Sequence, residues 1–202
     1  MLAATCGAVL GSGPASAQPP AASNLPLRAV NPILQASLTR ISGGSALWRD
    51  ALDTLAPTGR HAIVLTAEQV IVADPASSER RRFDPAVLAE VAPVPSDTGQ
   101  VHVVMVVVNL ALLQETHRTR HSLPWEFEAD LDRILVHEIY GHAFPYLLAG
   151  HLSGRCADPA PAERPADACS IRRENAVRAE LGLGRRTDRG LDGLALTRPE
   201  SR

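Results

Sequence analysis

The sequence predicts an α+β domain in which a small mixed or antiparallel sheet packs on a helix that carries the functional site. Three observations indicate this class. A strongly β-branched run spans residues 101–109, an amphipathic helical pattern begins near residue 122, and a second helical pattern lies further downstream. A chain of 202 residues is long enough for one domain with a substantial core, and we assign residues 31–202 to it.

The N-terminus resembles the end of a secretory signal peptide over residues 1–17. Ala15-Ser16-Ala17 before Gln18 fits an A-x-A cleavage site, although the basic region that normally begins such a signal is missing. The alternative is a disordered, alanine-rich N-terminus. Residues 18–30 are rich in Pro, Ala and Ser, and we expect a flexible leader there. The protein is therefore expected to be exported, to a periplasmic or extracellular location.

The composition and charge of the chain limit the classes of binding partner that can be expected. The formal net charge is −2 and all 20 basic residues are scattered arginines, which gives no indication of nucleic-acid binding. No apolar run after the N-terminus is long enough to span a bilayer. Cys156 and Cys169 remain after processing, and an oxidising compartment favours a disulfide between them over thiolate metal ligation. The oligomeric state is left open.

Two short helices are expected first. Asn31-Pro32 is a capping residue followed by proline, and the helix it starts should stop at Gly43-Gly44. A second helix is expected from Ser45 to Leu55. Both are interpreted as core packing.

Strand patterns follow these two helices in the sequence. The β-branched runs at residues 61–66 and 70–74 predict a hairpin. The charged loop after the hairpin holds an arginine triplet at residues 80–82, and residues 84–91 predict a short helix. Residues 101–109 are apolar on both faces and should form a central or well-covered strand. His117 and His121 then fall in a polar connection before the main helix.

The main helix carries the motif with the most chemical content. His137-Glu138-Ile139-Tyr140-Gly141-His142 reads H-E-x-x-x-H, with two imidazoles as nitrogen ligands and a carboxylate beside the first that is free to act as a general base. On a regular α-helix, histidines five residues apart diverge by roughly 140° and cannot share one metal. We therefore predict a π-bulge, which Gly141 tolerates and Pro145 favours by lacking an N–H donor.

The context of the motif also indicates a metal. The apolar stripe of the helix, with Leu131 and Leu135 among its members, continues to Glu138 and His142. Polar groups on a core-facing stripe need partners, and a metal supplies one. The alternative is a chance match of a short motif.

Catalytic zinc sites typically use three protein ligands and a water, so a third ligand is required. Glu174 is the favoured candidate, because it lies on the buried stripe of a helix that ends at Gly182, and Arg178 one turn later could orient it. The alternatives are a surface Glu174–Arg178 pair, or ligation by His151 or, more weakly, Glu180. Tyr140 and Tyr146 are candidates to donate to a developing oxyanion, with ordinary packing as the alternative.

The motif from His137 to His142 resembles the H-E-L-L-G-H signature of dipeptidyl peptidase III. In that family a downstream helix with an E-E-x-x-A-E pattern supplies the third zinc ligand, which the resemblance places at Glu174, although residues 174–180 do not match that pattern residue for residue. That family is several times larger, so the resemblance covers two helices. The pairing with a later E-N-x-x-R also resembles small zincin-like domains of bacterial secreted proteins and toxin modules. It implies a compact zincin of the glutamate-ligand group.

The predicted function is zinc-dependent peptide hydrolysis. One zinc held by His137, His142 and Glu174 would activate water, and Glu138 would act as general base on a peptide or protein substrate. The alternatives are an exported binding or scaffold domain with a structural zinc, and a hydrolase of non-peptide amides.

Overall fold

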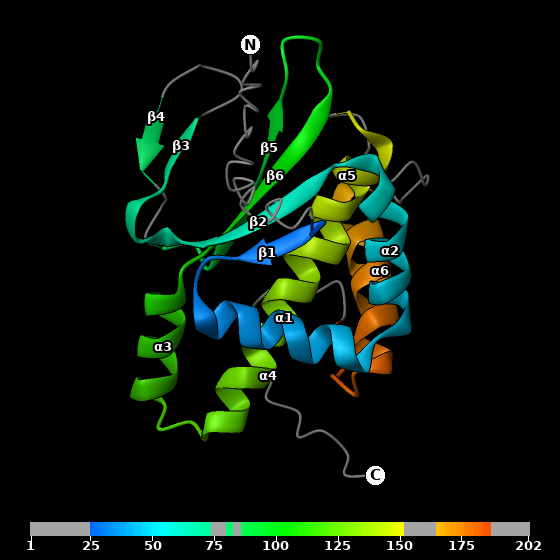
Figure 1. The fold of residues 1–202 in the computed structure, drawn as a ribbon. Coiled ribbons are helices and arrows are strands. Elements are labelled where there is room, and N and C mark those ends of the chain that lie inside the picture. The colour runs from blue at the N-terminus through cyan, green and yellow to red at the C-terminus, as the bar shows by residue number, and fades with distance from the viewer. Residues whose placement is uncertain (1–24, 74–79, 83–85, 152–164, 187–202) are drawn as a thin grey trace, which may run out of the picture.

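The computed structural model describes residues 25–73, 80–82, 86–151 and 165–186, so the expected signal peptide over residues 1–17 lies outside the described part. The described residues form a mixed α/β fold around a small four-stranded sheet (Figure 1). The helices are α1 (Pro32–Gly44), α2 (Ala46–Leu55), α3 (Leu110–Thr119), α4 (Pro124–Leu135), the π-helix η3 (Val136–Ala143), α5 (Phe144–Ala149) and α6 (Pro165–Glu180). The strands are β1 (Leu27–Ala29), β2 (His61–Thr66), β3 (Ile71–Ala73), β4 (Arg80–Arg82), β5 (Ala89–Pro95) and β6 (Val101–Val108), and the short 3₁₀ turns are η1 (Ala56–Thr58) and η2 (Ala67–Gln69).

The four-stranded sheet has the order β1-β2-β6-β5. β1, β2 and β6 are parallel, and β5 is antiparallel to β6, which confirms the prediction of a mixed sheet. Parallel neighbours need a crossover connection, and α1 and α2 supply it between β1 and β2. The predicted central strand is confirmed as β6, whose Val104, Val106 and Val108 are fully buried.

The first two helices begin where their capping residues predict. The side chain of Asn31 accepts a hydrogen bond from the Ile33 N–H at 2.8 Å, and Ser45 Oγ accepts one from the Trp48 N–H at 3.1 Å. Such caps satisfy donors that a helix start leaves without an internal partner. Among the described helices, none is long and apolar enough to cross a membrane.

The predicted hairpin of residues 61–66 with residues 70–74 is wrong. β2 pairs in parallel with β1 and β6, while β3 pairs antiparallel with β4 in a separate two-stranded sheet. The arginine triplet, expected in a loop, thus contributes the backbone of β4. The two runs are short and β-branched, so their sequence predicts strands but does not specify which partner each strand takes.

The predicted short helix over residues 84–91 is also wrong in its described part, because Ala89–Pro95 forms the edge strand β5. Pro93 and Pro95 have no N–H to donate to a neighbouring strand, which an edge strand tolerates on its unpaired side. β5 lies against the π-helix η3, so this edge of the sheet borders the predicted site.

The structure also corrects two predictions about segments that were expected to lack regular structure. The leader predicted over residues 18–30 includes β1, so the part of it that the structure describes is paired with β2. The predicted polar connection before the main helix contains α3, which begins at the Asn109 cap and carries His117 on its buried side. Leu110 and Leu113 pack this helix onto the main core.

The core beneath the sheet is centred on an aromatic group. Trp48 of α2 is fully buried; it stacks on Tyr140 of η3 with ring centroids 6.2 Å apart and contacts Phe144 of α5 at 5.3 Å. These contacts hold the π-helix against a helix that is distant in sequence, and aromatic pairs of this kind add to the free energy of burial.

We expect Trp48→Ala to lower the free energy of unfolding by about 3–5 kcal/mol, because it leaves a cavity where three elements meet. Trp125→Ala is the matched control, because Trp125 is 37% exposed and its replacement should change stability by roughly 0.5 kcal/mol or less. Urea denaturation of both variants measures the difference. Equal stability of the two variants would contradict the assignment of Trp48 to the core.

Candidate metal centre

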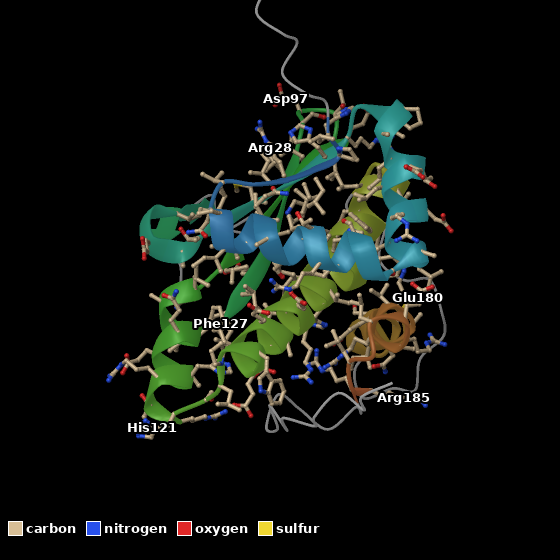
Figure 2. All side chains as sticks on the ribbon, turned by 60° about the horizontal axis from the view of Figure 1, so that its bottom comes forward. Arg28, Asp97, His121, Phe127, Glu180 and Arg185 are labelled. Carbon is tan, nitrogen blue, oxygen red and sulfur yellow. The ribbon has the colours of Figure 1, made fainter. Side chains whose placement is uncertain are left out.

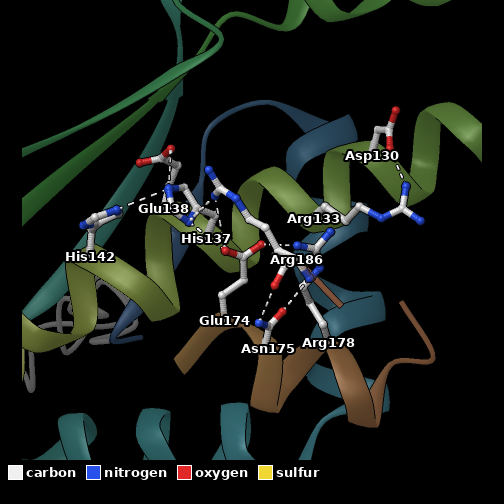
Figure 3. A network of polar contacts seen from close by, with 9 residues as sticks. All are labelled: Asp130, Arg133, His137, Glu138, His142, Glu174, Asn175, Arg178 and Arg186. Atoms are coloured by element: carbon white, nitrogen blue, oxygen red, sulfur yellow. Dashed lines mark hydrogen bonds and ion pairs between the residues drawn. The ribbon is translucent and has the colours of Figure 1, made fainter. Parts of the chain in front are cut away.

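The π-helix brings the two histidines of the motif together. The Phe144 N–H bonds to the Ile139 carbonyl, five residues earlier, which is the hydrogen-bond pattern of a π-helix and confirms the predicted bulge. Nε2 of His137 and Nε2 of His142 lie 3.3 Å apart, and the two rings are nearly perpendicular at 89°. The π-helical winding, which accommodates the extra residue, thus brings both imidazoles to the same side of the helix (Figure 3).

Helix α6 fixes the orientation of both rings from behind. Glu174 Oε2 lies 2.9 Å from Nδ1 of His137, and Ser170 Oγ lies 3.2 Å from Nδ1 of His142. Ser170 and Glu174 are four residues apart on one face of α6, so a single helix serves both rings. With Nδ1 of each ring engaged, the two Nε2 atoms are the ones that face each other. This is the arrangement that outer partners impose on metal-binding histidines.

Gly141 permits this close approach. A Cβ at Gly141 would lie 3.3 Å from both the Ser170 side chain and the Ser170 carbonyl oxygen. The absence of a side chain therefore allows α6 and η3 to pack backbone against backbone beside the site.

Glu138 completes a group of three possible metal donors. Its side chain is 14% exposed, and Oε1 lies 3.9 Å from Nε2 of His137. Within the part of the chain that the structure describes, His137, Glu138 and His142 form a group whose donor atoms all lie within 4.8 Å of one another. Burial raises the pKa of Glu138 above its usual range, and the charges of His137 and Arg186 oppose that shift.

The geometry of this group fits a metal ion. Two nitrogens bound to one tetrahedral ion at about 2.0–2.1 Å lie roughly 3.3 Å apart, which matches the separation of the two Nε2 atoms. Imidazole and carboxylate donors suit zinc and several other divalent ions, so the donors do not distinguish between these metals. His137, Glu138 and His142 could therefore hold a metal ion.

Glu174 is buried, as its place on the apolar stripe predicted, with 1% of its surface exposed. Arg178 donates to Oε1, and Arg186 Nη1 lies 3.4 Å from Oε2. Burial acts to raise the pKa of Glu174, but the hydrogen bond and charge of His137, with the charges of Arg178 and Arg186, leave it below its usual range. Within the histidine pair, Glu174 contacts Nδ1 of His137, and direct ligation of a metal by Glu174 stays a prediction.

Arg186 is a site residue that the sequence did not reveal. Asn175 Nδ2 donates to the Arg186 carbonyl at 2.8 Å, and Asn175 Oδ1 accepts from the Arg186 N–H at 2.7 Å. This clamp folds the chain back after α6, and Arg186 Nη1 reaches to 3.0 Å from Nδ1 of His137 (Figure 3). In the sequence, Asn175 and Gly182 were the signals available for this fold-back. They predict it only when α6 is already known to lie beside the His137–His142 motif.

The rival ligands lie elsewhere. His151 is exposed and its backbone forms a bridge with Gln100. Glu180 accepts from Ser45 Oγ at 2.5 Å, so it holds the start of α2. Neither belongs to the described donor group.

The remaining histidine, tyrosine and cysteine residues considered from the sequence have other contacts or lie apart from the donor group. His117 is buried against Asp130, with Nε2 3.2 Å from Oδ2, and His121 lies in the exposed turn between α3 and α4 (Figure 2). Tyr140 stacks on Trp48, and Tyr146 packs against the main core. Cys169 of α6 is disulfide-bonded, as predicted for it, and the expected partner Cys156 lies outside the described residues.

Comparison with known proteins yields no relative: no protein family matches the chain, and neither a curated protein nor a solved structure matches it. The geometry of the site is therefore the basis for a functional proposal.

We expect Ser170→Ala to weaken zinc binding roughly 10- to 100-fold, because His142 loses the hydroxyl that orients its ring. Competition against a chromophoric chelator measures the affinity. Ser96→Ala, in an exposed turn, is the control and should bind zinc like the parent. Equal affinities of the two variants would contradict an orienting role for Ser170.

Proposed function

We propose that this protein is an exported zinc-dependent peptidase in which His137 and His142 bind the metal and Glu138 acts as general base. The observation that supports it most directly is the pair of Nε2 atoms 3.3 Å apart, each on a ring whose Nδ1 is engaged by α6. The carboxylate of Glu138 beside this pair supplies the group that hydrolysis needs in addition to a metal.

In the proposed hydrolysis, the bound zinc, Glu138 and Glu174 each have a separate role. Bound zinc would lower the pKa of a coordinated water to about 7 and polarise the scissile carbonyl. Glu138, largely buried beside His137, would take the proton from the attacking water and pass it to the leaving amine. Glu174 would accept from Nδ1 of His137, which leaves the lone pair of Nε2 for the metal.

The sheet offers a place for an extended peptide. β6 is central and has no open edge, whereas β5 is an edge strand and contacts η3. A peptide that adds as a strand to β5 would run beside the metal-binding group. This placement supports peptides over other amides as substrates.

The alternative function, an exported scaffold with a structural zinc, has less support. Structural sites use four protein ligands, whereas the group in the described residues consists of two histidines and one carboxylate. One of the three is Glu138, which is also placed to act as a base. In this proposal the protein is a zincin-like enzyme, of the kind that the His137–His142 signature resembles.

Glu138→Gln should retain zinc and lose hydrolysis by a factor of roughly 100 to 10,000, because the amide cannot accept the proton. Elemental analysis gives the metal content, and turnover is measured on a mixed peptide library. Glu128→Gln on the exposed side of α4 is the control. Retained hydrolysis in Glu138→Gln would remove Glu138 from the mechanism, and a parent protein without metal would remove the proposal as a whole.

The role of Glu174 is tested by two substitutions. If Glu174 orients His137 through Nδ1, Glu174→Gln keeps an accepting oxygen and should bind zinc more tightly than Glu174→Ala, which should lose roughly 10- to 100-fold in affinity. Thermal unfolding of the metal-free proteins separates this effect from loss of folding. An equal and near-complete loss of zinc in both variants would support direct ligation instead.

A further inference from the structure

Arg186 is a cation at the site that the proposed mechanism does not use. The chain leaves α6 through Gly182, which has a positive φ of 68°, and the Leu183 N–H bonds to the Arg178 carbonyl at 2.9 Å. The two hydrogen bonds of Asn175 then hold the backbone of Arg186. Its side chain extends from beside Asn175 toward His137 and Glu138 (Figure 3).

Charge neutralisation of Glu174 does not require Arg186. Arg178 donates directly to Oε1 of Glu174 from the same helix, one turn away. Arg186 Nη1 lies 3.4 Å from Oε2, beyond the usual range for a charge-assisted hydrogen bond of about 2.7–2.9 Å. Arg178 is thus the direct partner of Glu174, and Arg186 is a second cation that extends toward His137 and Glu138.

The guanidinium group of Arg186 also has N–H donors without a hydrogen-bond partner among the described contacts. Among the described contacts, Nη1 lies 3.0 Å from Nδ1 of His137 and 3.4 Å from Oε2 of Glu174, and Nε and Nη2 have no partner. The side chain is 19% exposed, so it is neither sealed in the core nor fully solvated. A guanidinium held by its backbone, with free donors in a partly water-excluded site, is suited to bind an anionic oxygen in a fixed geometry.

We propose that Arg186 binds an anionic oxygen of the substrate next to the metal. This inference rests on the proposed function. The oxygen has two possible sources: the oxyanion that develops at the scissile carbonyl, or a carboxylate that the substrate carries. Both present the same chemistry to a guanidinium, and they predict different specificities.

The experiment uses the zinc-loaded full-length chain and two probes. A phosphinic pseudodipeptide blocked at both ends represents the tetrahedral oxyanion, and N-acetylglycine, compared with its neutral amide, represents a carboxylate. Isothermal titration calorimetry measures the affinity of each probe, and zinc content is measured on the same samples. The variants are Arg186→Gln, Arg186→Lys, Asn175→Ala and Arg185→Gln.

Arg185→Gln is the matched control, because Arg185 is the exposed neighbour on the same turn and its replacement removes the same charge (Figure 2). We expect Arg186→Gln to keep zinc and to bind one probe roughly tenfold or more weakly, since it loses a hydrogen bond to a charged group. Arg186→Lys should recover part of the affinity, and Asn175→Ala should lose part of it by releasing the Arg186 backbone. Arg185→Gln should match the parent.

The outcomes distinguish an oxyanion from a substrate carboxylate, and they distinguish failure of the Arg186 proposal from failure of the proposed function. Weakened binding of the phosphinic probe identifies the oxyanion, and weakened binding of N-acetylglycine but not of its amide identifies a substrate carboxylate. The proposal is overturned if Arg186→Gln binds both probes as Arg185→Gln does, if the zinc-loaded parent binds neither probe, or if Arg186→Gln loses zinc. A parent without zinc would instead remove the proposed function.

Discussion

The contact between the π-helix η3 and α6 is the constraint on which the site depends. If η3 were wound as a regular α-helix, His137 and His142, five residues apart, would point to different sides of the helix. Without α6, each ring would be free to turn about its side-chain bonds, and Nδ1 rather than Nε2 could face the partner ring. Gly141 links the two conditions, because it lies in the π-helix and also opposite Ser170 of α6. The motif and the downstream helix therefore form one unit.

This unit places a carboxylate in the core, which is costly unless the charge is compensated. Glu174 is compensated on three sides, by Arg178, Arg186 and the Nδ1 of His137. Burial lowers the pKa of Arg178, and the charge of Glu174 opposes that shift, so each group of the pair favours the charged form of the other. A pair of this kind contributes little net stability but strongly penalises the loss of one partner. Its role is therefore to fix where the Glu174 carboxylate points, and so which nitrogen of His137 is left for a ligand.

The sequence predicted those parts of the fold and site that are decided locally. Capping by Asn31 and Ser45, the central strand β6 and the π-bulge at Gly141 each depend on residues within about one turn or one strand. The predictions that were wrong depended on partners distant in sequence. The run at residues 61–66 takes β1 and β6 as neighbours, so its closeness to residues 70–74 along the chain was misleading. Arg186 was missed for the same reason, because its place follows from a fold-back after α6.

The two histidines are held by different chemistry, and the difference matters for a metal site. Two imidazole nitrogens 3.3 Å apart cannot both direct lone pairs at each other; either one N–H donates to the other nitrogen, or a cation lies between them. Glu174 is an acceptor, so its contact with Nδ1 of His137 favours the tautomer with the proton on Nδ1 and the lone pair on Nε2, and in that tautomer Arg186 is a neighbouring charge and not a donor to Nδ1. Ser170 is both donor and acceptor, so it can pair with Nδ1 of His142 in either tautomer. Nε2 of His137 is thus available to a metal, whereas His142 could exchange an N–H···N hydrogen bond for a metal without losing its contact with Ser170. This asymmetry is compatible with a pair of histidines that could hold a metal ion.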